Sequence, residues 1–128
     1  MDEDARRPLE LIPDGVDLED QTVQGIYLER FVKALWPEVR TLPLKQRWAF
    51  LLHLDREEIV AFIHHGCCSL HQVAESLQIS PEEFAEWFAR IPAPDDSIAE
   101  RLGLARRQVI NLRKCARERL GRRLKAWD

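Results

Sequence analysis

The sequence predicts an all-α fold, and three observations support this prediction. Apolar residues recur at helical spacing along most of the chain, helix-start signals precede several of these stretches, and no alternating stretch rich in β-branched residues could serve as a strand. With 128 residues, 45% of them hydrophobic and 32% charged, the chain is long enough for one core and too short for two large ones. We therefore expect a single helical domain over residues 21–128.

The first elements are separated by composition and by prolines. Residues 1–20 are acidic and contain two prolines and a glycine, a composition typical of a flexible segment with little structure of its own. The next stretch, residues 21–36, has apolar side chains at helical spacing, and Pro37 is predicted to end this helix. A second helix is expected to begin after Pro43 and to bury Trp48 and Leu51.

Three further helix starts are marked by side-chain caps, in which a short polar residue accepts a hydrogen bond from the backbone of the first turn. These caps are Asp55 with Glu58, Ser69 with Gln72, and Ser80 followed by Pro81. The start at Ser80 is the clearest, because proline suits the first helical position and acids in the first turn complement the helix dipole.

The most informative segment is residues 95–125. A short helix with apolar Ile98 and Leu102 and the small Ala99 is followed by Gly103, which can supply a left-handed turn, and then by a long basic helix. This order of elements predicts a helix-turn-helix, a motif that places its second helix in the major groove of DNA.

Charge is distributed unevenly along the chain, although the formal net charge is only -3. Residues 100–125 contain ten basic side chains and two acidic ones, and the rest of the chain has a large excess of acids. A basic helix on an acidic body directs one face toward a polyanion. The alternative interpretation is a solvated helix end, because basic residues near a helix C-terminus also complement its dipole.

A helical wheel over residues 106–125 separates a buried stripe from an exposed one. The predicted buried stripe is Val109, Leu112, Ala116 and Leu120, with Leu124 at its edge. Because Asn and Gln pair with adenine and Arg pairs with guanine, the predicted base-reading residues are Arg107, Gln108 and Asn111. The predicted phosphate contacts are Arg106, Arg113, Lys114 and Arg117. The later basic residues contact flanking backbone or only solvate the helix end.

An earlier segment resembles the start of this helix-turn-helix. Residues 70–80 and 96–105 share the order apolar-Ala-Glu-x-Leu-x-apolar. The helix after the first segment, residues 81–90, carries three glutamates against one arginine, so it should repel phosphates. We interpret residues 69–90 as a structural or protein-contacting helical pair.

Two blocks of the chain resemble a known family. The residues TLPLKQRWAFLL at 41–52 are similar to the opening of region 4 in sigma-70-type transcription initiation factors. Residues 97–104 and 116–120 resemble the helix-turn-helix of that family and the end of its recognition helix. Residues 55–94 stand where typical members have a short connection, so the chain resembles a region 4 with an inserted helical hairpin.

The resemblance implies binding to double-stranded promoter DNA upstream of the start site and docking on core RNA polymerase. The family also needs a larger region that melts the promoter, and residues 1–40 are too short to hold it. We therefore expect a C-terminal piece of a longer factor, one half of a split factor that pairs with a second sigma-like subunit, or a regulator that reuses the fold. The alternative function is a protein-protein interaction module that keeps the helix-turn-helix shape without reading DNA.

Other classes of protein find little support in the sequence. No glycine-rich phosphate loop, serine elbow or convincing His-carboxylate pair is present, so we expect neither an enzyme nor a cofactor. His64, Cys67, Cys68 and His71 cluster, but a helix that ends at Gly66 with packed cysteines explains them better than a metal site. Few cysteines, no secretory leader and no long apolar run predict a cytoplasmic protein without membrane contact.

Overall fold

A computed structural model describes residues 21–125 of the chain and the side chains of residues 29–124. The predicted flexible segment, residues 1–20, lies outside the described residues. Within them the fold is all-α, with seven helices and no strand, which confirms the predicted class. The helices are α1 (Gln21–Arg40), α2 (Leu44–Leu51), α3 (Arg56–His64), α4 (Leu70–Ser76), α5 (Pro81–Phe88), α6 (Asp95–Leu102) and α7 (Arg106–Lys125).

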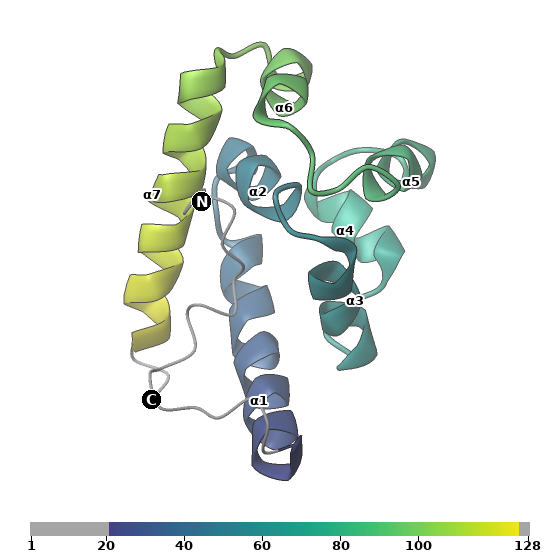
Figure 1. Cartoon of the computed structure of the whole chain (residues 1–128), viewed down its shortest axis with the longest axis vertical. Helices are drawn as coiled ribbons and strands as arrows, with labels where there is room; N and C mark the ends of the chain where they lie inside the picture. Colours follow the sequence, from purple (N-terminus) through teal and green to yellow (C-terminus); the bar gives the residue numbers. More distant parts are fainter. Residues whose placement is uncertain (1–20, 126–128) are drawn as a thin grey trace.

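The two long helices define one side of the molecule, and the short helices build the other (Figure 1). α7 packs most extensively against α2 and also contacts α6 and α1. α3, α4 and α5 are grouped on the side opposite to α7, and α6 lies at the N-terminal end of α7 (Figure 1). α2 therefore lies between the basic helix and the segment 55–94.

A single hydrophobic core joins all seven helices. Residues 55–94, which the sequence marked as an insertion, contribute large buried side chains to this core: Ile59, Phe62, Val73, Leu77, Phe84 and Trp87. Three tryptophans are buried, with 5% of Trp36, 2% of Trp48 and 5% of Trp87 exposed, and the burial of Trp48 confirms the expectation for the second helix. Helices α3, α4 and α5 thus share one core with the other helices.

The predicted end of the first helix at Pro37 is wrong, because α1 continues through this residue to Arg40. Pro37 removes one backbone N–H from the helix, and its ring crowds the preceding turn. The residue itself is exposed, whereas Trp36 and Val39 on either side of it are buried in the core. Burial of these two side chains keeps the helix continuous across the missing hydrogen bond.

The predicted helix starts at Asp55, Ser69 and Ser80 are confirmed. Asp55 and Ser69 form complete capping boxes at the starts of α3 and α4, and the hydroxyl of Ser80 accepts a hydrogen bond from the first turn of α5. Gly66 follows the last turn of α3 with a φ of 76°, as predicted for a helix that ends there. Each cap joins two residues that are three positions apart, so it could be predicted from the local sequence.

The turn between α4 and α5 has the same backbone hydrogen bonds as the turn between α6 and α7. In each turn one residue has a positive φ, 60° at Gln78 and 71° at Gly103. The N–H of this residue donates to the carbonyl three residues earlier, and the following N–H donates to the carbonyl five residues earlier. The two similar sequence segments therefore end their helices in similar left-handed turns, with glutamine in the left-handed position of the first.

We expect reciprocal substitutions in these two turns to change stability in opposite directions. Gln78→Gly relieves the left-handed strain and should stabilise the fold by about 0.5 kcal/mol, because the gain is partly offset by the flexibility of glycine in the unfolded chain. Gly103→Gln should destabilise it by about 1 kcal/mol. A Cβ at Gly103 meets no atom within 4 Å, so only backbone strain contributes. Urea unfolding of each variant measures the change, and a loss of stability in Gln78→Gly would contradict the expectation.

Candidate nucleic-acid interface

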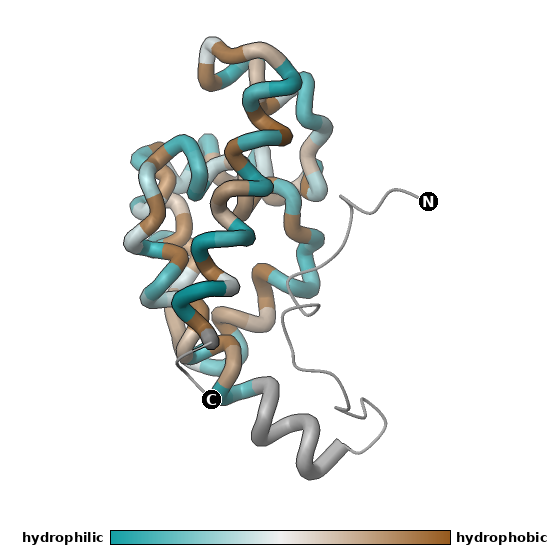
Figure 2. Tube along the Cα trace, turned by 90° about the vertical axis from the view of Figure 1, so that its left-hand side faces the viewer, coloured by the Kyte–Doolittle hydropathy of each residue, from teal (hydrophilic) through white to brown (hydrophobic). Residues whose placement is uncertain are grey.

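α7 has one buried face and one exposed face, as the helical wheel predicted. Val109, Ala116 and Leu120 are at most 1% exposed, Leu124 is 9% exposed, and Leu112 is half-buried against the core. Figure 2 views the molecule from the side of α7, where hydrophilic and hydrophobic residues alternate along the helix. The buried face attaches α7 to α2, and the other face is presented outward.

Two of the predicted base-reading residues lie on this outer face, and their side chains form no hydrogen bond or ion pair within the described residues. Arg107 and Asn111 are exposed one helical turn apart, and Lys114 continues the same stripe. Gln108 is also exposed, but its Oε1 accepts a 2.8 Å hydrogen bond from the backbone N–H of Ala105 and so caps the start of α7. The side-chain NH2 of Gln108 and the second lone pair of its Oε1 remain for a ligand, but this hydrogen bond restricts where the amide can point.

Arg113 must be removed from the predicted phosphate contacts. Its side chain is 4% exposed and forms two hydrogen bonds with the carboxylate of Asp95, at 2.8 and 3.2 Å. Asp95 is the first residue of α6 and is 14% exposed, so the pair crosses the interface between α6 and α7. The guanidinium is thus committed to holding the two helices together.

The other predicted phosphate contacts remain on or near the surface. Lys114 is exposed and Arg117 is half-buried. Arg106 is 63% exposed and lies 3.8 Å from the carboxylate of Asp96, which is 81% exposed. An ion pair this long and this solvated contributes little, so a phosphate can replace Asp96 at low cost.

Ion pairs reduce the number of basic residues that face solvent without a counter-charge. Near the end of α7, Arg123 lies 3.6 Å from Glu38 of α1. Among the described residues, the exposed cations of α7 that form no ion pair with a carboxylate are Arg107, Lys114 and Arg122. The usable positive charge is therefore smaller than the sequence count and is concentrated in one stripe.

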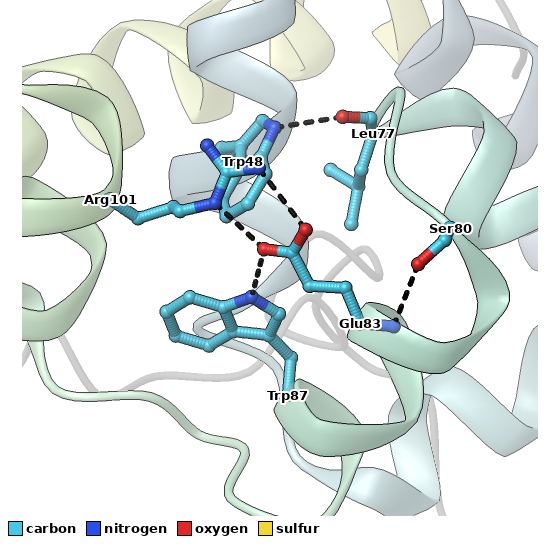
Figure 3. A network of polar contacts seen from close by, with 6 residues as sticks. All are labelled: Trp48, Leu77, Ser80, Glu83, Trp87 and Arg101. Carbon is cyan, nitrogen blue, oxygen red and sulfur yellow. Dashed lines mark hydrogen bonds and ion pairs between the residues drawn. The ribbon is translucent and has the colours of Figure 1, made fainter.

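A polar network at the C-terminal end of α6 was not predicted from the sequence (Figure 3). Arg101 forms a forked interaction with Glu83 of α5, at 2.7 and 3.2 Å, and its guanidinium lies 5.0 Å from the centre of the Trp48 ring. The indole N–H of Trp87 donates to the same carboxylate at 3.2 Å. The hydrogen bond from Arg101 lowers the pKa of the Glu83 carboxyl below its ordinary value.

The segment at 41–52 supplies two side chains that bind the C-terminal end of α4. The indole N–H of Trp48 donates to the carbonyl of Leu77 at 3.0 Å, and Arg47 donates to the neighbouring carbonyl of Ser76. Arg47 also donates to the carbonyl of Leu42 at 2.9 Å. A cation at these C-terminal carbonyls complements the dipole of α4. Burial, and to a smaller extent the charge of Arg40, lowers the pKa of the Arg47 guanidinium.

The cysteines near Gly66 are packed as free thiols. Cys67 is half-buried and Cys68 is 8% exposed. Burial raises the pKa of Cys68 to about 12, which favours the protonated thiol over the thiolate that binds metals. Within residues 29–124, no three His, Cys, Asp or Glu side chains converge in a way that could hold a metal ion.

Comparisons with protein-family models, with curated proteins and with solved structures found no match for this chain. In the described part of the chain, no helix has both the length and the apolar character needed to span a bilayer. A functional conclusion therefore depends on the α6–α7 surface itself.

We expect Arg113→Met to destabilise the protein by about 3 kcal/mol, because it leaves the nearly buried carboxylate of Asp95 without its counter-charge. Lys114→Met is the matched control, because it also replaces a cation by methionine, at the next and exposed position. It should alter stability by about 0.5 kcal/mol or less. Urea unfolding measures both variants. Equal stabilities of the two would show that the Asp95 pair does not hold α6 to α7.

Proposed function

We propose that this chain is a double-stranded DNA-binding domain that reads a promoter element through α7, in the manner of region 4 of sigma-70-type factors. The observation that carries the proposal is the exposed stripe of Arg107, Asn111 and Lys114 at the start of a long helix that follows a left-handed turn at Gly103. Recognition helices of helix-turn-helix proteins read bases with residues in this part of the helix.

The chemistry of the stripe fits the edges of base pairs. Arg107 carries a planar fork that can bind the two acceptors of guanine, and the Asn111 amide can donate to and accept from adenine. At a rise of 1.5 Å per residue, the stripe from Arg107 to Lys114 is about 10 Å long, which matches about three base-pair steps. Binding is the proposed activity, and no catalytic step is included.

Phosphate contacts are proposed for Arg106, Lys114 and Arg117. Lys114 is the last residue of the exposed stripe, and Arg106 lies at the N-terminus of α7, where the helix dipole also favours an anion. Asp96 lies near Arg106 and would be displaced or screened when DNA binds. These contacts supply affinity that does not depend on sequence.

Core RNA polymerase is the proposed protein partner, alone or together with a second sigma-like subunit. The support is the resemblance of residues 41–52 and the exposure of Lys45 within them. Arg47 is bound to two backbone carbonyls, so it is a poor choice for a polymerase contact.

A protein-interaction module is the second candidate function, and one observation favours it. Glu82 and Glu86 are exposed on α5, the helix that follows the left-handed turn at Gln78. An acidic helix repels phosphates and suits a basic protein surface. In this function, loss of Arg107 or Asn111 would leave partner binding intact.

The DNA-binding proposal predicts distinct effects for bases and phosphates. In fluorescence anisotropy with the whole chain, a duplex selected from a random pool should bind more tightly than its scrambled version, and affinity should fall with salt. Arg107→Ala and Asn111→Ala should each lower this preference by about tenfold, because a bidentate base contact is worth about 1–3 kcal/mol. Lys114→Ala should weaken both duplexes equally and reduce the salt slope by about one.

The control is Arg56→Ala, which removes an exposed cation from α3 and so changes the net charge by the same amount. It should leave the sequence preference unchanged. Absence of any binding at low salt would reject the proposal and leave the protein-interaction module as the function to test.

A further inference from the structure

α6 is held at both ends by side chains of other helices. It has eight residues, and Pro94 at its N-cap provides no side-chain cap. A helix of this length is not stable alone in water, so its position depends on tertiary contacts. Ile98 and Ala99 bury one face. Asp95 at one end is tied to α7, as described above, and Arg101 at the other end is tied to α5.

The Arg101 side chain is 44% exposed, and its guanidinium contacts two other helices. Its fork binds both carboxylate oxygens of Glu83, and its guanidinium plane lies against the ring of Trp48 (Figure 3). Glu83 is fixed in turn by the indole N–H of Trp87, and the Trp87 and Trp48 rings meet edge to face with centres 5.7 Å apart. Forked ion pairs of this kind fix orientation as well as distance.

α5 is itself firmly placed, so the tie connects α6 to a rigid support. Phe84 and Trp87 of α5 are buried in the core, and the Ser80 hydroxyl accepts a 3.0 Å hydrogen bond from the backbone N–H of Glu83. These contacts hold the backbone of α5 at Glu83, so they also limit where the Glu83 carboxylate can lie.

The position of Arg101 makes this tie relevant to the reading helix. Arg101 stands two residues before the left-handed Gly103, and the first turn of α7, with Arg107, follows directly. Without the Arg101 contact, α6 keeps the Asp95 pair and its buried face, but the end of α6 next to Gly103 loses its link to α5.

We propose that Glu83 is a positioning residue for DNA recognition, which acts through Arg101 to fix the turn at Gly103 and the reading end of α7. In this proposal, helices α3–α5 support the reading surface through the contact between Glu83 of α5 and Arg101 of α6. The DNA part of this inference rests on the proposed function, whereas the mechanical part, that Glu83 restrains the turn, does not.

The test compares Glu83→Gln with Glu82→Gln in the whole chain. Both variants remove one negative charge from the first turn of α5, but Glu82 is exposed and makes no ion pair with Arg101. The net charge of the chain therefore changes by the same amount in both variants. We expect Glu83→Gln to lower the affinity ratio between selected and scrambled duplex by about fivefold, with an unchanged salt slope, and Glu82→Gln to preserve the ratio.

Arg101→Met and the double variant separate positioning from direct DNA contact. If Arg101 acts only through Glu83, the double variant loses no more sequence preference than either single variant. If Arg101 touches DNA, its loss lowers affinity further in the Glu83→Gln background, and the proposal is overturned. Equal ratios for Glu83→Gln and Glu82→Gln overturn it as well.

Hydrogen exchange of backbone amides gives a readout that needs no DNA. Amides of residues 103–108 should exchange faster in Glu83→Gln than in Glu82→Gln, while amides in the middle of α7 stay equally protected. If the unmodified chain binds no DNA, the proposed function fails, and this comparison still decides whether Glu83 restrains the turn. Unchanged exchange in this segment rejects the inference even if DNA binding is confirmed.

Discussion

The structure depends on side-chain ties at the ends of short helices. Helices α2 to α6 have seven to nine residues each, and helices of this length are marginal in water without tertiary support. Core burial fixes one face of each, but a single apolar face lets a short helix rotate or slide. The C-terminal carbonyls of α4 are bound by Arg47 and Trp48, and α6 is bound through Asp95 and Arg101. These ties define one arrangement of the short helices.

The same ties determine how much positive charge is available for a ligand. Arg101 and Arg113 are the best-paired cations of the basic segment, and both are used between helices. A buried ion pair gains little over an apolar contact of the same shape, but it penalises every arrangement in which a partner is missing. Arg113, with 4% of its side chain exposed, therefore contributes specificity of packing, whereas the Arg101–Glu83 pair is partly solvated and contributes mainly through its forked geometry.

Local signals were readable from the sequence, whereas long-range pairs were not. A capping box such as Asp55 with Glu58 lies within one turn, and the buried face of α7 follows from helical periodicity alone. The helix end predicted at Pro37 was wrong because burial of Trp36 and Val39 outweighs the hydrogen bond lost at the proline. This burial is seen only in the fold. Arg113 lies on the buried side of the wheel, between Val109 and Ala116, and this position was the available signal. Its partner is far along the chain, so the pair itself could not be inferred.

The turns before α5 and α7 have the same backbone form, but the helices that follow them carry opposite charges. At a constant offset along the chain, Arg107 and Asn111 of α7 correspond to Glu82 and Glu86 of α5, while the two turns share their hydrogen bonds. Similar turns are therefore followed by helices of opposite charge, and a polyanion is attracted to one helix and repelled by the other. α5 and α7 are on opposite sides of α2 (Figure 1). Under the proposed function, the acidic helix therefore disfavours the approach of DNA from the side of α5 and leaves α7 as the favoured face.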